Sequence, residues 1–424
     1  MKKFVALLLA LTLCIGLCAC GAQPEAPAAT DAPAAEAPAE ETPAATSETE
    51  ATTGSKDIKV GFIFLHDENS TYDLNFINAA KAACAEVGLS DDQVMMKTNI
   101  SESQACYDAA AELVDAGCDL IITDSFGHES FALAAAKEFP EVHFVSCTGV
   151  KAHTEGLNNF HNAFASIYEG RYLAGVAAGL KLNEMIENGD ITAEEAKMGY
   201  VGAFPYAEVK SGYTSFFLGA RSVCPSVTME VTFTSSWYDE ALEKEAANKL
   251  INNGCVLISQ HADSMGAPTA CETAGVPNVS YNGSTVAACP NTFIVSSRID
   301  WTPFFVYAIN CVASGEDIGY DWTGTLATGS VVLTDVNEQA AAVGTAEKIA
   351  EVMKALEDGS VKVFDTATFT VNGETVTTYL ADVDDLGDYV GETEAISDGV
   401  FLESFYRSAP YFDLDIDGIT NLDA

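Results

Sequence analysis

The chain has 424 residues, of which 48% are hydrophobic and 9% aromatic, so it is long enough to bury at least two substantial cores. Its 62 acidic side chains outnumber its 20 Lys and Arg side chains and give a formal net charge of −42 at pH 7. A charge of this sign and size repels polyanions, which disfavours binding to nucleic acid and adhesion to anionic lipid through charge. We therefore expect no nucleic-acid partner.

The start of the chain has the layout of an export signal. Two lysines precede an apolar run over residues 4–16, which is too short to span a bilayer as a permanent anchor. The string LCAC (17–20) follows at once and resembles a bacterial lipobox. The resemblance implies a signal segment over residues 1–20, lipidation of Cys20, and a membrane-anchored protein at the extracytoplasmic face of the cell membrane. A secretory signal without lipid, or a short membrane helix, is the alternative.

Residues 21–56 consist almost wholly of Ala, Pro, Glu, Thr and Ser. Because this stretch lacks aromatic and branched aliphatic side chains, it cannot bury enough surface to offset the entropy of the chain. The composition predicts a disordered tether, after which the folded part begins near residue 57.

Of the 12 cysteines, three lie in residues 1–20. The other nine are scattered singly, with no C-x-x-C spacing, and are expected to be small buried apolar residues. The first strand of the folded part is not followed by a glycine-rich phosphate loop, and the chain has no G-x-S-x-G elbow and no pair of histidines at helical spacing. We therefore expect no cofactor, no metal centre and no enzymatic activity.

The tail segment 363–380 predicts a β-hairpin around Asn372-Gly373.

A repeat of short β-branched runs and Ala-rich helical stretches indicates parallel sheets joined by crossover helices. The string KVGFIF (59–64) returns as KMGYVG (197–202), an offset of 138, and AGCDLIITD (116–124) returns as NGCVLISQH (253–261), an offset of 137. Pro140 and Pro277, each opening another strand, share the offset of 137. The repeat predicts an α/β protein of two similar Rossmann-like lobes with a ligand cleft between them.

Aromatic and hydrogen-bonding residues gather in the segments that follow the predicted strands, where ligands bind in parallel sheets. The aromatic residues are Tyr72, Phe126, Phe204, Tyr206, Trp237, Tyr238 and Tyr281, with Trp301 near the same edge, and the polar residues are Asn69, Asp124, Ser125, Gln260, His261, Asp263 and Asn282. Flat aromatic walls with a few polar groups suit a planar heterocycle or a sugar. The alternative is that aromatic residues at strand ends only fill the interface between the lobes.

Several strings in these segments resemble one family. They are SFGHE (125–129), YEGRYLAG (168–175), AFPYAEVKSG (203–212), SSWYDEALEKEAA (235–247), QHADS (260–264) and VSSRIDWTPFFVYAI (295–309). Together they are similar to the basic membrane protein (BMP) family, the Med/PnrA-like substrate-binding lipoproteins. The resemblance implies a type I periplasmic-binding-protein fold, an ABC permease and ATPase as partners, and a purine nucleobase or nucleoside as ligand.

The same resemblance assigns roles to single positions. Tyr72 and Trp237 occupy the places of the aromatic residues that stack on the base, and Asp263 lies in the QHADS string. Asn282 stands where many relatives carry an acidic residue, which favours a free base slightly over a nucleoside because an amide accepts fewer hydrogen bonds from ribose hydroxyls.

We expect residues 57–165 to form lobe 1, and residues 166–299 to form a crossover helix and lobe 2, with parts of 300–424 completing both. The expected ligand-binding residues are Tyr72, Ser125, Phe126, Phe204, Trp237, His261, Asp263, Asn282 and Trp301. Two other functions share such a cleft: a ligand-sensing subunit of a receptor, and an exported nucleoside hydrolase. Another heterocycle, such as a flavin, is the alternative ligand.

Overall fold

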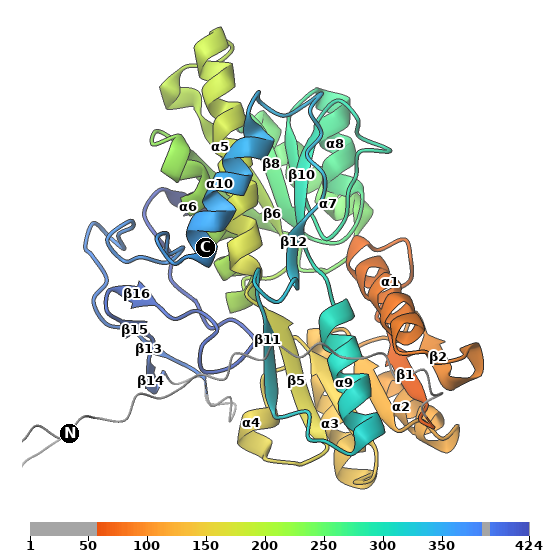
Figure 1. Ribbon diagram of the computed structural model, residues 1–424. Helices are drawn as coiled ribbons and strands as arrows, with labels where there is room; N and C mark the ends of the chain where they lie inside the picture. The colour runs from red at the N-terminus through yellow and green to blue at the C-terminus, as the bar shows by residue number, and fades with distance from the viewer. Residues whose placement is uncertain (1–56, 384–390, 424) are drawn as a thin grey trace, which may run out of the picture. The chain divides into compact units, whose positions relative to one another are not determined.

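The computed structural model describes residues 57–383 and 391–423 (Figure 1). The expected signal segment, Cys20 and the tether lie outside these residues. Within the described part of the chain, no helix has both the length and the apolar character needed to cross a membrane.

Lobe 1 is built on a six-stranded parallel sheet in the order β11-β5-β4-β3-β1-β2. Its strands are β1 (Val60–Ile63), β2 (Val94–Lys97), β3 (Leu120–Thr123), β4 (His143–Cys147), β5 (Phe160–Ala165) and β11 (Asp321–Gly324). Its helices are α1 (Thr71–Glu86), α2 (Gln104–Asp115), α3 (Glu129–Glu138), α4 (Ala152–Glu155) and α9 (Thr302–Ser314). Helix α9 returns from the second lobe and packs against α1.

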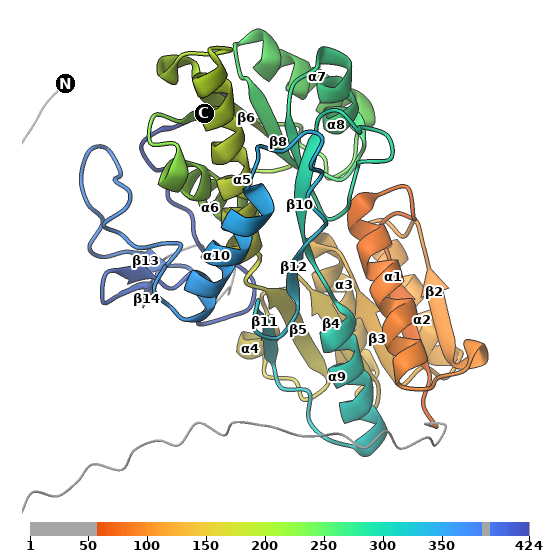
Figure 2. The ribbon, with the colours of Figure 1, turned by 45° about the horizontal axis from the view of Figure 1, so that its top comes forward.

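Lobe 2 is built on a seven-stranded sheet in the order β12-β10-β9-β8-β6-β7-β17, parallel except for β12. Its strands are β6 (Lys197–Gly202), β7 (Thr228–Phe233), β8 (Leu257–His261), β9 (Asn278–Tyr281), β10 (Phe293–Ile299), β12 (Val331–Leu333) and β17 (Ile419–Asn421). Its helices are α5 (Ile167–Asn188), α6 (Ala207–Val223), α7 (Glu240–Asn252), α8 (Gly266–Ala274) and α10 (Thr345–Glu357). Helix α10 lies along α5 (Figure 2).

The two sheets have the same topology, because β5-β4-β3-β1-β2 in lobe 1 matches β10-β9-β8-β6-β7 in lobe 2. The strings that repeat in the sequence form β1 and β6, and β3 and β8. Strands β1 and β3 are buried at every position, as expected for parallel strands covered by helices on both faces. The predicted α/β fold of two Rossmann-like lobes is confirmed.

Helices α5 and α6 approach each other closely enough to require glycine. A Cβ atom on Gly175 would lie 2.0 Å from the carbonyl oxygen of Phe216, and one on Gly219 would lie 2.0 Å from the carbonyl oxygen of Tyr172. Both distances are far below van der Waals contact, so larger residues would push the helices apart. This packing holds the first half of α5, directly after the crossover from lobe 1, firmly against lobe 2.

The predicted hairpin over residues 363–380 is wrong beyond its turn. Asn372 and Gly373 do form a turn with positive φ of 53° and 81°. In the described residues, however, its arms share one isolated bridge between Val371 and Glu374. The turn is held instead by a distant residue, since the Gly373 N–H donates to the Asp417 carboxylate at 2.7 Å. Short strand pairs follow: β13 (Leu380–Ala381) with β14 (Thr393–Glu394), and β15 (Ile396–Ser397) with β16 (Val400–Phe401).

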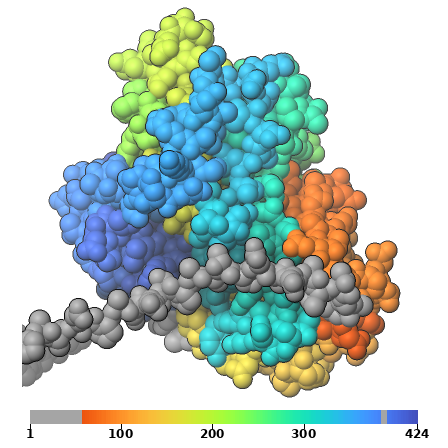
Figure 3. Space-filling model, in the orientation of Figure 1, coloured from red at the N-terminus to blue at the C-terminus, as the bar shows by residue number. Residues whose placement is uncertain are grey.

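The C-terminal segment (residues 391–423), drawn in blue in Figure 3, contacts both lobes. Its Ser408 N–H donates to the Asp321 carboxylate of β11 in lobe 1 at 2.8 Å. Its Glu403 carboxylate accepts a hydrogen bond from the Ser211 hydroxyl of α6 in lobe 2. The segment therefore links the two lobes on the side where α5 and β11 lie.

Candidate functional site

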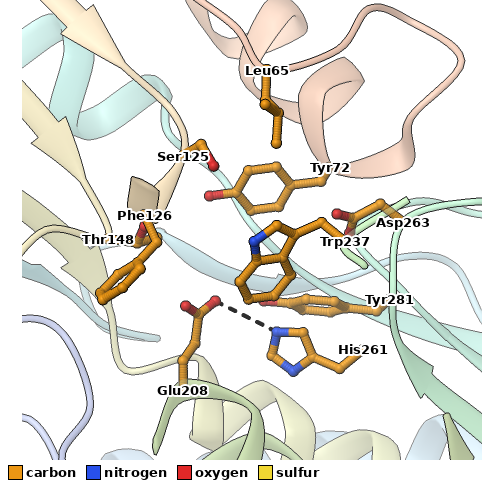
Figure 4. Close-up of a pocket in the computed structure, with 10 residues that line it drawn as sticks. All are labelled: Leu65, Tyr72, Ser125, Phe126, Thr148, Glu208, Trp237, His261, Asp263 and Tyr281. Atoms are coloured by element: carbon orange, nitrogen blue, oxygen red, sulfur yellow. Dashed lines mark ion pairs between the residues drawn. The ribbon is translucent and has the colours of Figure 1, made fainter. Parts of the chain in front are cut away.

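A cavity lies between the loops at the carboxyl ends of the two sheets (Figure 4). Lobe 1 contributes Leu65, Tyr72, Ser125, Phe126 and Thr148 to its lining, and lobe 2 contributes Glu208, Trp237, His261, Asp263 and Tyr281. The empty space measures about 340 Å³, but the centre of a water-sized sphere can occupy only about 20 Å³ of it. That is room for a water molecule or two, so a larger ligand enters only when the lobes or the lining side chains move.

The lobe 1 wall is positioned by the first turn of α1. The Ser70 hydroxyl accepts a hydrogen bond from the Asp73 N–H and caps the helix. The cap sets Tyr72 on the cavity side, where its hydroxyl donates to the Asp124 carbonyl at 2.7 Å. Burial raises the pKa of Tyr72 well above its usual value, so the phenol stays neutral. Tyr72 is therefore a fixed, uncharged aromatic wall.

The lobe 2 wall is centred on Trp237, whose indole lies between Tyr72 and Tyr281 in Figure 4. Its ring meets that of Phe204 edge to face at a centroid distance of 5.2 Å. Tyr72 and Phe126 of lobe 1 and Trp237 and Tyr281 of lobe 2 thus border one small space. Flat ligands stack favourably on such surfaces.

His261 is held neutral at the end of β8. Its Nε2 lies 3.5 Å from the Glu208 carboxylate, the pair marked by the dashed line in Figure 4. Burial, assisted by the positive charge of Arg171, nevertheless lowers the pKa of His261 to about 4. At neutral pH the ring therefore carries no charge.

Asp263 contributes a carboxyl group to the lining of the cavity. Its side chain is 5% exposed, and its carboxyl receives no hydrogen bond from any other residue that the structure describes. Burial, together with the negative charges of Asp73 and Glu243, raises the pKa of Asp263 well above its ordinary value. A protonated carboxyl can both donate and accept a hydrogen bond. It therefore suits the edge of a heterocycle that carries hydrogen-bond donors and acceptors side by side.

The lobes touch around this cavity. The Thr71 N–H donates to the Asp263 carbonyl across the lobes at 3.1 Å, and the Thr71 hydroxyl does so at 3.2 Å. The rings of His66 and Tyr238 lie 5.3 Å apart. These contacts indicate a closed arrangement of the two lobes.

Six of the expected site residues line the cavity: Tyr72, Ser125, Phe126, Trp237, His261 and Asp263. Phe204 is not part of the lining, but its ring stacks on Tyr206 at a centroid distance of 5.1 Å and touches Trp237. Asn282 lines a separate groove between α1 and the loop after β9.

The structure corrects the expectation for Trp301. Its side chain is 1% exposed and stacks on Phe76 at a ring distance of 4.4 Å in the core of lobe 1. The chain has already crossed back toward lobe 1 at this point, and α9 begins at the next residue. Trp301 therefore faces the core of the lobe and not the cavity.

Four lining residues are not among the expected site residues: Leu65, Thr148, Glu208 and Tyr281. Glu208 is the most informative omission, because it sits one residue inside α6 within the AFPYAEVKSG string. The pattern of strands does not single out Glu208, because it lies on a helix. The resemblance of the AFPYAEVKSG string to the family was the signal that could have identified it.

Metal and disulfide chemistry receive no support in the described part of the chain. Among residues 57–383 and 391–423, no three His, Cys, Asp or Glu side chains are grouped to hold a metal ion. All nine cysteines of this part are buried, as expected, and none of them is paired in a disulfide.

We predict that Trp301→Ala destabilises the fold by about 3–5 kcal/mol, because it removes a fully buried ring from a packed core. Denaturant unfolding measures the loss. Phe405→Ala is the control, since Phe405 is 73% exposed and its removal should change stability by less than about 0.5 kcal/mol. A stable Trp301→Ala variant would contradict the core assignment.

Comparison with known proteins gives a family, relatives and a fold. A model of the family described as ABC transporter substrate-binding protein PnrA-like (Bmp) matches residues 64–363. A purine-binding protein of Brucella abortus is 30% identical over 268 residues, which cover 62% of this chain and 71% of that protein. A putative ABC transporter glucose-binding protein of Haloferax volcanii is 31% identical over 235 residues, 55% of this chain and 56% of that protein.

Among solved structures, an ABC transporter solute-binding protein of Conexibacter woesei has the same fold. It superposes with a TM-score of 0.58 at 20% identity, covering 72% of this chain and 98% of the other.

Proposed function

Because the chain belongs to the Bmp family of PnrA-like substrate-binding proteins of ABC transporters, we propose that its ligand is a purine nucleobase or nucleoside. The family role is the capture of a small molecule outside the cytoplasm for an importer. The purine itself, and a lipid anchor on Cys20, belong to the proposal.

The observation that supports a purine best is the pairing of aromatic walls with an unpaired carboxyl. Tyr72 faces the cavity from one lobe, and Trp237 and Tyr281 face it from the other. Asp263 supplies a buried group that other described residues leave free to bond. A planar base can stack between such rings while its polar edge meets Asp263. The likeness to the Brucella purine-binding protein agrees with this reading.

A sugar is the second candidate, because the Haloferax relative is described as a putative glucose-binding protein. Sugars present hydroxyl groups around their whole rim, and the lining offers the carboxyl groups of Asp263 and Glu208 to only part of such a rim. Among the described residues, no Asn, Gln, Lys or Arg side chain lines the cavity. The composition of the lining therefore favours a flat heterocycle.

Binding would act through closure of the lobes. A base that touches Tyr72 of lobe 1 and Trp237 of lobe 2 gains both sets of contacts only when the lobes are together. Such a ligand shifts the equilibrium toward the closed state, which a permease can distinguish from the open one.

Isothermal calorimetry against adenine, guanine, hypoxanthine, their nucleosides, riboflavin and glucose tests the ligand. We expect a purine to bind most tightly, and to raise the stability by about 2.7 kcal/mol at 100 times its dissociation constant. Tight binding of glucose or riboflavin with no response to any purine would overturn the proposal.

Two further assays separate the rival functions. Chromatography of a nucleoside incubated with the protein should recover it intact, whereas released base and sugar would indicate a hydrolase. Deletion of the gene should reduce purine uptake by the cells, whereas unchanged uptake would favour a sensor.

We predict that Trp237→Ala weakens purine binding by roughly ten- to a hundredfold, because stacking of a base on an aromatic ring is worth about 1–3 kcal/mol. Calorimetry measures the change. Phe405→Ala, an exposed ring on the C-terminal segment, should bind like the wild type. Unchanged affinity in Trp237→Ala would refute the stacking role.

We predict that Cys20→Ala releases the protein from the cell membrane, because the substitution removes the expected site of lipidation. Fractionation of cells, followed by mass measurement of the membrane-bound form, tests this. A Cys20→Ala variant that stays membrane-bound would contradict the lipid anchor.

A further inference from the structure

Arg171 is a fully buried cation beside the cavity. It lies near the start of α5, where the glycine contacts with α6 fix the helix. The centre of its guanidinium is 3.5 Å from the centroid of the Tyr281 ring. Tyr281 lines the cavity and Arg171 does not, so the charge acts on the cavity through that ring.

The guanidinium is poorly paired for a buried charge. Its Nη1 donates to the Gln260 carbonyl at 3.2 Å, while Nε and Nη2 find no hydrogen-bond partner among the described residues. No carboxylate in the described part of the chain forms an ion pair with it. An unpaired buried charge costs free energy, so packing alone does not account for it.

The cavity would favour cations without this residue. Four aromatic residues beside the carboxyl groups of Asp263 and Glu208 make the kind of cage that binds quaternary ammonium and methylated cations. The lining itself carries no Lys or Arg. Arg171, packed on the face of a lining ring, is a positive charge that opposes this preference.

The effect of the charge reaches other groups of the wall. The positive charge of Arg171 helps burial to lower the pKa of His261, and it opposes burial in setting the pKa of Asp263. The guanidinium on the face of Tyr281 also reduces the negative electrostatic potential that an aromatic face presents to a cationic ligand.

We infer that Arg171 is a specificity-determining residue that makes the cavity select neutral heterocycles and reject positively charged ones such as N-methylated purine cations. The inference rests on the proposed function, since it concerns the charge of the ligand in the same cavity. It predicts discrimination between ligands of nearly equal shape.

The test compares neutral nucleosides with their cationic N-methylated derivatives by calorimetry at pH 6. The pairs are adenosine with 1-methyladenosine and guanosine with 7-methylguanosine. The wild type should bind the neutral member at least tenfold more tightly. Wild-type protein that binds the cation equally well or better would overturn the inference without any variant.

The variants Arg171→Met and Arg171→Lys separate charge from shape. Arg171→Met should shift the ratio of the two affinities toward the cation by tenfold or more, whereas Arg171→Lys should keep the wild-type preference. If Arg171 had only a structural role, Arg171→Met would lower the affinity for both ligands alike and leave the ratio of the two affinities unchanged. Arg221→Met is the matched control, because Arg221 also covers an aromatic ring of lobe 2, that of Phe217, but does not border the cavity.

A readout without ligand separates this inference from the proposed function. The groups facing His261 are Glu208 from α6, Arg171 from α5, Tyr281 from β9 and Trp237. In Arg171→Met, NMR titration should show the pKa of His261 rising above its value of about 4, while burial keeps it below the ordinary value for histidine. If no purine binds the wild type, the proposed function fails, and an unchanged His261 titration would then overturn the role of Arg171 as well.

Discussion

The contact between Thr71 and Asp263 is the constraint on which the site depends. Thr71 opens α1 of lobe 1, and both its N–H and its hydroxyl donate to the Asp263 carbonyl of lobe 2. The same residue that joins the lobes through its backbone presents its carboxyl to the cavity. The closed arrangement of the lobes therefore holds in place a residue whose carboxyl lines the cavity. A ligand that bonds to this carboxyl stabilises the closed form directly.

The chemistry of the cavity follows from burial of charge around this contact. Asp263 is driven toward its neutral form, and His261 is neutral despite Glu208 beside it. Arg171 remains as a buried cation behind Tyr281. Neutral polar groups between aromatic rings discriminate by shape and hydrogen bonding, and the cation beneath adds discrimination by charge.

The repeat of nearly constant offset was enough to predict both lobes, because parallel strands buried on two faces appear as continuous apolar runs wherever they occur. The loops that hold the cavity followed from the strands. Trp301 could not be placed, because an aromatic residue after a strand has the same appearance whether it faces a cleft or a core. Arg171 and Glu208 lie on helices, and their approach to the cavity depends on helix packing that strand patterns do not contain.

The central claim is that a flat purine binds between rings of the two lobes and bonds to Asp263. A crystal structure of the protein grown with the tightest-binding purine tests it most directly. We expect the base to stack on Tyr72 or Trp237, with its polar edge within hydrogen-bonding distance of the Asp263 carboxyl. A purine bound elsewhere, or bound in this cavity without contact to either ring, would contradict the account.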